Sequence, residues 1–128
     1  MAALSKIRLN SIYNALKENL EKINDIHFIA QKVAVDAVGM KTICFDLAKE
    51  FDSLFIVLGG ESNGKALLTC YISKGLATQK EWNATNIIRS LGKHIQGGGG
   101  GQNFFATAGG KNPNGIEKAL EEARTILS

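Results

Sequence analysis

Apolar residues recur along the chain with two different periods, and these periods predict its helices and strands. Near the start, five apolar residues alternate in spacings of four and three, as on one stripe of a helix from about Ser5 to Lys22: Leu9, Tyr13, Leu16, Leu20 and Ile23. Three ways of burying this stripe stay open, namely packing on its own domain, on a preceding part of a longer chain, or on a second copy.

The next segment predicts a strand, a helix and a second strand. Ile26 to Ala30 is rich in strand formers, and Asp36 is suited to cap a helix with this apolar face: Met40, Ile43, Cys44, Leu47 and Phe51. The continuous apolar run from Leu54 to Leu58 ends at a glycine pair. Such a run is typical of a strand covered on both faces, so we expect it at the centre of a sheet.

The second half predicts a hairpin, two more helices and another strand. Asn63-Gly64 favours a tight turn, after which Ala66 to Ile72 returns antiparallel. Asn83 is suited to cap a helix that carries Ile87, Ile88, Leu91 and Ile95 and ends at Gly97. Phe104 to Ala108 predicts a strand, and Asn112-Pro113 opens a last helix with this apolar face: Ile116, Ala119, Leu120, Ala123 and Leu127.

The predicted fold class is α+β, with an amphipathic N-terminal helix followed by a small globular domain. The order strand, helix, strand, strand, helix, strand, helix indicates a mixed sheet packed against helices, close to the split βαβ pattern. We expect residues 1–24 to form the helical segment, used for packing or dimerisation, and residues 25–128 to form the globular domain.

Composition limits the chain to one compact core, since it has 128 residues and 45% apolar content. We expect a cytoplasmic protein without membrane association, because no apolar run reaches transmembrane length and the start lacks a signal-peptide core. Cys44 and Cys70 fall at apolar positions, so buried thiols are favoured over a disulfide or a metal pair. His27 and His94 have no partner at ligand spacing, so no zinc site is predicted.

Positive charge gathers around a run of five glycines. Between Ser62 and Ile116 the chain carries six basic residues and one acid, or +5, which leaves −2 for the remainder of its +3. A main chain without side chains beside basic residues is suited to an anionic partner such as a phosphate chain. The candidate binding residues are Lys93, His94, Gly97, Gly98, Gly99, Gly100, Gly101, Gln102, Asn103, Gly109, Gly110 and Lys111.

Other chemistry finds little support in the sequence. Gly59 to Lys65 matches the first seven positions of a P-loop, but Ala66 stands where the motif needs a hydroxyl, and the residues after it favour a strand rather than a helix. No paired acids near a histidine and no cysteine with an evident base are present, so no catalytic residue is predicted. A binding module is the class that the residues favour.

The stretch from Gly97 to Lys111, a glycine run followed by Ala-Thr-Ala-Gly-Gly-Lys, resembles the closing signature of the C-terminal domain of alanyl-tRNA synthetase. The same signature marks the DHH-associated domain of DHH-type phosphoesterases, whose catalytic Asp-His-His cluster has no counterpart here. The order of the predicted elements extends the resemblance over essentially the whole chain.

This resemblance implies a tRNA-binding domain that helps the rest of a parent synthetase aminoacylate and proofread alanine tRNA. It implies ATP, magnesium and zinc on other domains of that parent, no cofactor in this fragment, and a homodimer through the leading helix as an option. Gln102 and Phe104 stand where many members have a basic and an acidic residue, so backbone contacts with Lys93 and Lys111 would carry more of the binding. Two alternatives stay open, a substrate-binding domain of a DHH-type phosphoesterase and a free-standing proofreading fragment.

Overall fold

The computed structural model describes residues 14–23, 26–33, 37–51, 53–62, 64–73, 75–76, 78 and 82–127. Within these residues the chain forms a six-stranded mixed sheet in the order β1-β2-β3-β4-β6-β5. The strands are β1 Glu21–Ile23, β2 Ile26–Lys32, β3 Leu54–Ser62, β4 Lys65–Ile72, β5 Gly97–Gly101 and β6 Phe105–Gly110. The helices are α2 Ala37–Glu50, α4 Ala84–Gly92 and α5 Ile116–Leu127, with 3₁₀ turns η1 Lys93–Ile95 and η2 Pro113–Gly115. The predicted fold class is confirmed.

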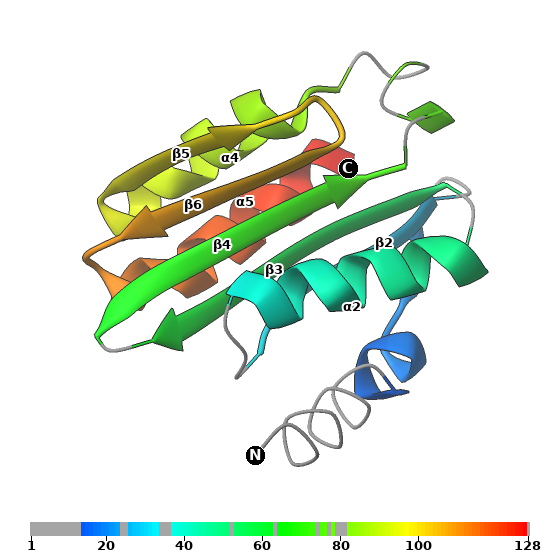
Figure 1. Ribbon diagram of the computed structural model, residues 1–128, viewed down its shortest axis with the longest axis horizontal. Coiled ribbons are helices and arrows are strands. Elements are labelled where there is room, and N and C mark those ends of the chain that lie inside the picture. Colours follow the sequence, from blue (N-terminus) through cyan, green and yellow to red (C-terminus); the bar gives the residue numbers. More distant parts are fainter. Residues whose placement is uncertain are drawn as a thin grey trace.

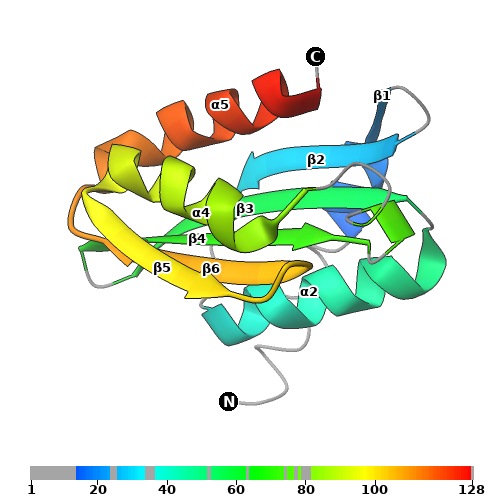
Figure 2. The same ribbon diagram turned by 90° about the horizontal axis from the view of Figure 1, so that it is seen from above.

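Helices cover both faces of this sheet. α2 lies on one face, while α4 and α5 lie on the other (Figure 1, Figure 2). Strands β2 and β3 pair in parallel, as a strand, helix, strand connection through α2 requires, and the other neighbours pair antiparallel. In the view of Figure 1, β5 and β6 lie in front of α4 and α5, whereas α2 lies over β3.

The central strand is β3, as the apolar run predicts. Every residue from Leu54 to Gly60 is buried, and alternate side chains supply the two halves of the core. Leu54, Ile56 and Leu58 pack with α2, whereas Phe55 and Val57 pack with α4 and α5. The predicted hairpin is also confirmed, because β4 pairs antiparallel with β3 up to Ser62 and Lys65. The P-loop alternative is thereby excluded.

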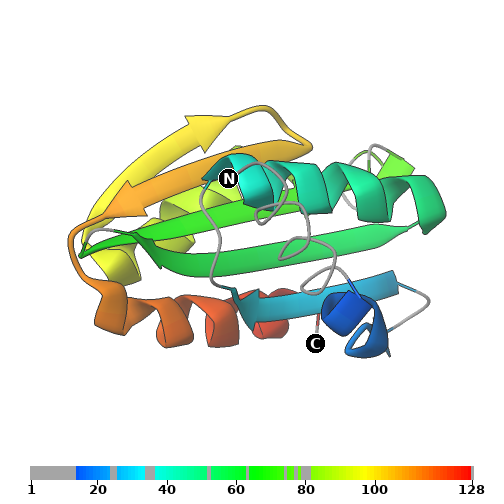
Figure 3. The same cartoon turned by 60° about the horizontal axis from the view of Figure 1, so that its bottom comes forward.

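The leading segment differs from the prediction. Residues 14–18 are helical, but the helix does not continue to Lys22, because residues 21–23 form β1 against β2. Leu16 is fully buried in the cluster that α2 and β3 share, so this part of the predicted stripe packs on its own domain. Figure 3 shows the turn of helix beside β2, away from β5. Leu9 and Tyr13 lie outside the described residues.

Helix ends match the predicted caps in part. The side chain of Asn83 accepts hydrogen bonds from the Thr85 and Asn86 amides, which confirms it as the N-cap of α4. At the other end the predicted exit at Gly97 is wrong, because Gln96 takes the left-handed conformation with φ 55° and Gly97 already belongs to β5. Asn112-Pro113 opens the 3₁₀ turn η2 rather than α5 directly. Asp36 lies outside the described residues.

Both cysteines are free and buried, as predicted, and burial raises the pKa of each thiol. Among the described residues, no group of three metal-ligating side chains gathers, and no helix is long and apolar enough to cross a membrane.

Candidate nucleic-acid interface

The glycine run is a strand and not a loop. Gly97 to Gly101 form β5 at one edge of the sheet, paired antiparallel with β6 from Gly97 opposite Gly110 to Gly101 opposite Ala106. The main chain of the glycine run is therefore held in place, as predicted, by its regular antiparallel pairing with β6. One side of this strand faces β6 and the other is the edge of the sheet.

Alternate glycines of β5 point their polar groups outward. The Gln102 amide donates to the Phe105 carbonyl at 2.7 Å, next to the Gly101 and Ala106 pair. Because hydrogen-bonded and non-hydrogen-bonded pairs alternate along an antiparallel ladder, Gly97, Gly99 and Gly101 direct their N–H and C=O groups away from β6. The edge therefore offers backbone donors at every second residue.

The same three glycines have no room for a side chain. A Cβ atom at Gly97 would overlap the Gly109 carbonyl oxygen, one at Gly99 that of Thr107, and one at Gly101 that of Phe105. At Gly98 nothing lies within 4 Å of a Cβ atom, and at Gly100 only the Thr85 methyl does, at 3.9 Å. None of the five has φ in the left-handed region, so close approach to β6 is what requires glycine.

The turn after β5 is tied to the start of α4. The Asn103 carbonyl accepts the Ala84 amide at 2.9 Å, and the Gln102 carbonyl accepts the Thr85 hydroxyl at 3.2 Å. The first of these bonds satisfies a backbone N–H in the first turn of α4 that lacks a partner within the helix. Both bonds also hold the glycine strand at its far end, while η1 holds it at the near end.

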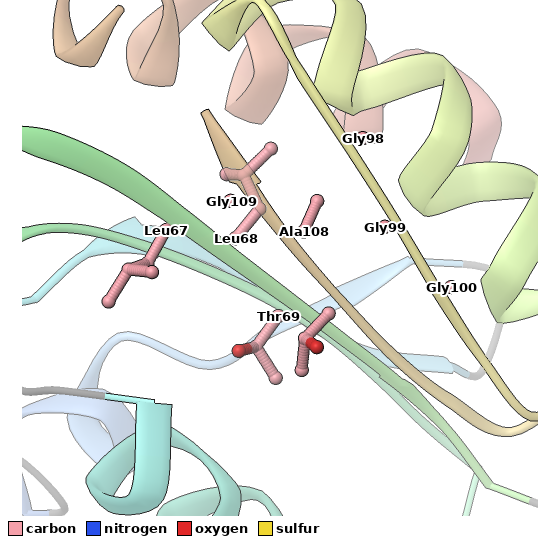
Figure 4. Close-up of a pocket in the computed structure, with 9 residues that line it drawn as sticks. Leu67, Leu68, Thr69, Gly98, Gly99, Gly100, Ala108 and Gly109 are labelled. Atoms are coloured by element: carbon pink, nitrogen blue, oxygen red, sulfur yellow. The ribbon is translucent and has the colours of Figure 1, made fainter. Parts of the chain in front are cut away.

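Two adjoining hollows of about 300 and 370 Å³ lie on the α2 side of this edge and share Gly100 and Thr107. We call them together the glycine groove. Figure 4 shows the first, with Gly98, Gly99 and Gly100 along one side and Thr69 between them and α2. The lining residues are Lys41, Phe45, Leu67, Leu68, Thr69, Gly98, Gly99, Gly100, Gly101, Gln102, Phe104, Phe105, Thr107, Ala108 and Gly109.

Positive charge borders the glycine groove. Lys41 of α2 lines it, and Lys65 alternates along β4 with Leu67 and Thr69, so it faces the same side. The pairing of Ala66 with Gly110 brings Lys65 next to exposed Lys111 at one end of the strands. No lining residue is acidic.

The nearest acids of α2 are directed elsewhere. With about 3.6 residues per turn, Glu50 lies on the opposite side of the helix from Lys41, where it accepts a hydrogen bond from Lys17 at 3.2 Å. Asp46 is 3.9 Å from Lys49. The groove therefore keeps a positive border.

Lys93 and His94 lie on the other face of the sheet, beside α5. His94 Nε2 is 3.0 Å from the Glu122 carboxylate, whose second oxygen accepts from the Ser90 hydroxyl at 2.7 Å. Burial raises the pKa of Glu122, but the His94 and Ser90 hydrogen bonds, together with the charges of His94 and Lys93, outweigh burial and lower it. His94 thus fastens η1 to α5 at the entry to β5.

The structure divides the predicted site residues into two groups. Gly98, Gly99, Gly100, Gly101, Gln102 and Gly109 line the glycine groove, and Gly97 and Lys111 lie at its end. The backbone of Asn103 holds α4, and a Cβ atom at Gly110 would overlap the Ile95 carbonyl oxygen, so these two have structural roles.

Sequence reasoning missed Lys41 and Phe45. A signal was present, because Phe45 is an aromatic residue outside the predicted apolar stripe of its helix, four residues after a lysine.

Comparison with known proteins gives consistent matches. The family model of the DHHA1 domain matches residues 25–128. The alanine–tRNA ligase of Christiangramia forsetii is 50% identical over 125 residues, and that of Cytophaga hutchinsonii is 40% identical over 118. These matches cover 98% and 91% of this chain but 14% of each relative, so the chain spans about one seventh of their length.

Solved structures agree with these matches. The C-Ala domain of Aquifex aeolicus alanyl-tRNA synthetase matches with a TM-score of 0.72 and 25% identity, covering 85% of this chain and 97% of that one. A DHH-domain protein described as a member of a family of ribosomal proteins matches with a TM-score of 0.58, over 96% of this chain and 31% of that one. At 14% identity, the second likeness concerns the fold alone.

Proposed function

We propose that this chain, which belongs to the DHHA1 domain family, binds tRNA as the C-terminal domain of an alanine–tRNA ligase. The observation that carries the proposal is a side-chain-free edge strand with outward N–H groups beside a groove that has Lys41 and no acid in its lining, with Lys65 and Lys111 at its border. Backbone N–H groups and lysines together suit phosphate oxygens. Such contacts position the RNA without reading its base sequence.

The activity of the whole ligase belongs to the proposal as well. In it, the domain assists aminoacylation and proofreading of alanine tRNA in the cytoplasm, while the rest of the parent supplies catalysis with ATP, magnesium and zinc. Within the domain, the proposed contacts are the five glycines of β5, Gln102, Gly109, and the lysines at the groove. Lys93 and His94 lie beside α5, on the face of the sheet opposite the groove, so they are not proposed to contact the same stretch of RNA.

A salt-series titration of the 128-residue chain with alanine tRNA and an unrelated tRNA tests the proposal. With Lys41, Lys65 and Lys111 as phosphate contacts, we expect affinity to fall roughly 20- to 40-fold between about 50 and 200 mM salt. Equal affinity for the two tRNAs would indicate recognition of shape. The absence of salt-dependent binding to either would contradict the proposed function.

A variant at Gly98 connects this binding to the groove. Gly98 lines the groove and has nothing within 4 Å of a Cβ atom, so we expect Gly98→Leu to bind tRNA about tenfold more weakly with unchanged thermal stability. Gly75→Leu is the matched control, because Gly75 is exposed, equally open, and outside the groove lining. Equal affinities of the two variants would argue against the groove.

The leading segment, residues 1–24, is proposed to join the domain to the parent and to carry a homodimer contact. Since Leu16 is buried in the domain's own core, a substitution there reports on folding and not on assembly. Leu9→Glu changes the same sequence stripe before the described residues. Sedimentation of this variant and the wild type tests the dimer, which is refuted if both sediment as monomers.

A further inference from the structure

The end of the glycine groove next to α2 is lined with aromatic rings. Phe45, Phe104 and Phe105 line this hollow with Lys41 and Gln102, and all three rings are partly buried. The Phe45 ring stacks on Phe105, with centroids 5.5 Å apart and planes 24° apart, and meets Tyr71 edge-on at 5.7 Å. These contacts hold the Phe45 and Phe105 rings of this aromatic wall in place before any ligand arrives.

A cation lies over this wall. Lys41 Nζ is 5.9 Å from the Phe45 centroid, on the exposed side of α2. The hollow measures about 370 Å³, which falls near the lower end of small-molecule sites, about 300–1,000 Å³. Its contents would meet aromatic side chains on one side, glycine backbone on another, and an ammonium group and a side-chain amide at the rim.

This combination matches one nucleotide whose base is not stacked on its neighbours. A flat base has a π-face that aromatic side chains accept whatever its sequence, and the phosphate beside it is attracted by lysine and backbone N–H groups. A carboxylate ligand could use Lys41 but not the ring faces, and an apolar peptide could use the rings but not the lysine and N–H groups. Of these three ligands, the nucleotide uses both kinds of surface.

Charge also distinguishes this side of the domain from the other. The exposed side of α5 carries Glu117 and Glu121 with Lys118 and Arg124, and Arg124 is bonded to Glu21 while Glu122 contacts His94. Such mixed charge gives a polyanion little net attraction. The aromatic hollow lies on the side where the bordering charges are lysines.

We propose that the aromatic end of the glycine groove binds one unstacked base of the RNA, with Phe104 in the stacking wall and Lys41 at the adjoining phosphate. This proposal rests on the proposed function and adds a subsite to it. The glycine strand then contacts the sugar-phosphate chain on one side of that base, and α2 becomes part of the RNA-binding surface.

Substitution at Phe104 tests the stacking. Phe104→Leu keeps an apolar side chain but removes the ring, and we expect alanine tRNA to bind roughly 5- to 100-fold more weakly at an unchanged salt slope. Phe104→Tyr keeps the ring, and we expect it to bind within about threefold of the wild type. Thermal melts of both variants show whether the fold is intact.

Two probes separate a base subsite from general loss of affinity. Alanine tRNA has unpaired bases, whereas a blunt RNA duplex of about 16 base pairs offers none. We expect Phe104→Leu to leave duplex binding unchanged. Equal loss with both probes, or no loss with tRNA, would overturn the base subsite.

Variants of exposed lysines test independently which face of the domain binds RNA, because these substitutions do not alter the hydrophobic core. We expect Lys41→Ala to weaken tRNA binding and to lower the salt slope by about one, whereas Lys118→Ala on α5 changes neither. The reverse ranking would overturn the choice of face. If the wild type shows no salt-dependent binding, the proposed function fails; if it binds and Phe104→Leu binds equally well, only the base subsite fails.

Discussion

The glycines of β5 divide into two kinds, and single alanine substitutions should separate them. At Gly99 a Cβ atom would overlap the Thr107 carbonyl oxygen and come within 2.6 Å of the Ala108 Cα atom. Both neighbours are backbone atoms of β6, which cannot turn aside as a side chain would. Relief requires that the strands separate, so overpacking and weakened ladder hydrogen bonds add, and we expect a loss of about 2–3 kcal/mol from the free energy of unfolding.

Gly98→Ala is the matched control. Its Cβ atom would have nothing within 4 Å, and the backbone is not in the left-handed region. Alanine there restricts the unfolded chain without strain in the folded one, so we expect stability within about 0.5 kcal/mol of the wild type.

Thermal melts followed by circular dichroism measure the difference. At about 4 °C per kcal/mol for a chain of this length, Gly99→Ala should melt about 10 °C below the wild type and Gly98→Ala within about 2 °C. Equal melting temperatures for the two variants would refute the assignment of Gly99 to close packing against β6. A large loss in Gly98→Ala alone would reverse the inferred orientation of the strand.

Two further predictions concern the supports of the site. Because the folded-state pKa of Glu122 lies below its ordinary 4.5, its stabilising effect is present above that value and is lost as pH falls below it; Glu122→Gln should cost about 1 kcal/mol at pH 6 and less at pH 3, as melts at both pH values would show. Leu16 is fully buried against the α2 side of the core, so Leu16→Ala should cost about 2–4 kcal/mol in urea unfolding, and a loss below about 0.5 kcal/mol would contradict that packing.

Where burial and turn chemistry agree, the sequence predicts this fold well. The apolar run of β3 requires cover on both faces, Asn63-Gly64 requires a tight reversal, and Asn83 requires a helix to cap. Each of these is a local pattern with one physical solution. The structure places β3 at the centre, joins it to β4 by a hairpin, and begins α4 at Ala84.

Strand β5 could not be predicted in the same way. Five glycines have no side chain to pack and no intrinsic preference for a strand, so their conformation comes from their neighbours. The ladder with β6, the bonds from the turn to α4, and the left-handed residue Gln96 together set it. None of these is visible until the chain is folded.

The groove also escaped prediction, for a related reason. Lys41 and Phe45 lie more than fifty residues before the glycines, and only the crossing of α2 over the sheet brings them to the same hollow. Sequence proximity instead suggested Lys93 and His94, which the turn through η1 directs toward α5. Clustering along the chain therefore indicated the glycine run as a candidate site, but it could not show that Lys93 and His94 lie beside α5 while Lys41 lies at the groove.

The backbone atoms of the glycine strand serve two purposes, because they pack against β6 and also offer the N–H groups proposed to bind RNA. At Gly97, Gly99 and Gly101 the N–H groups face outward while the space for a Cβ atom is taken by β6, so any side chain there would displace the donors themselves. Gly98 also lines the groove, but a Cβ atom there would have nothing within 4 Å, so a side chain would leave the ladder intact. Binding defects at the first three positions therefore cannot be told from folding defects, whereas a stable Gly98 variant that loses tRNA shows that the groove itself makes the contact.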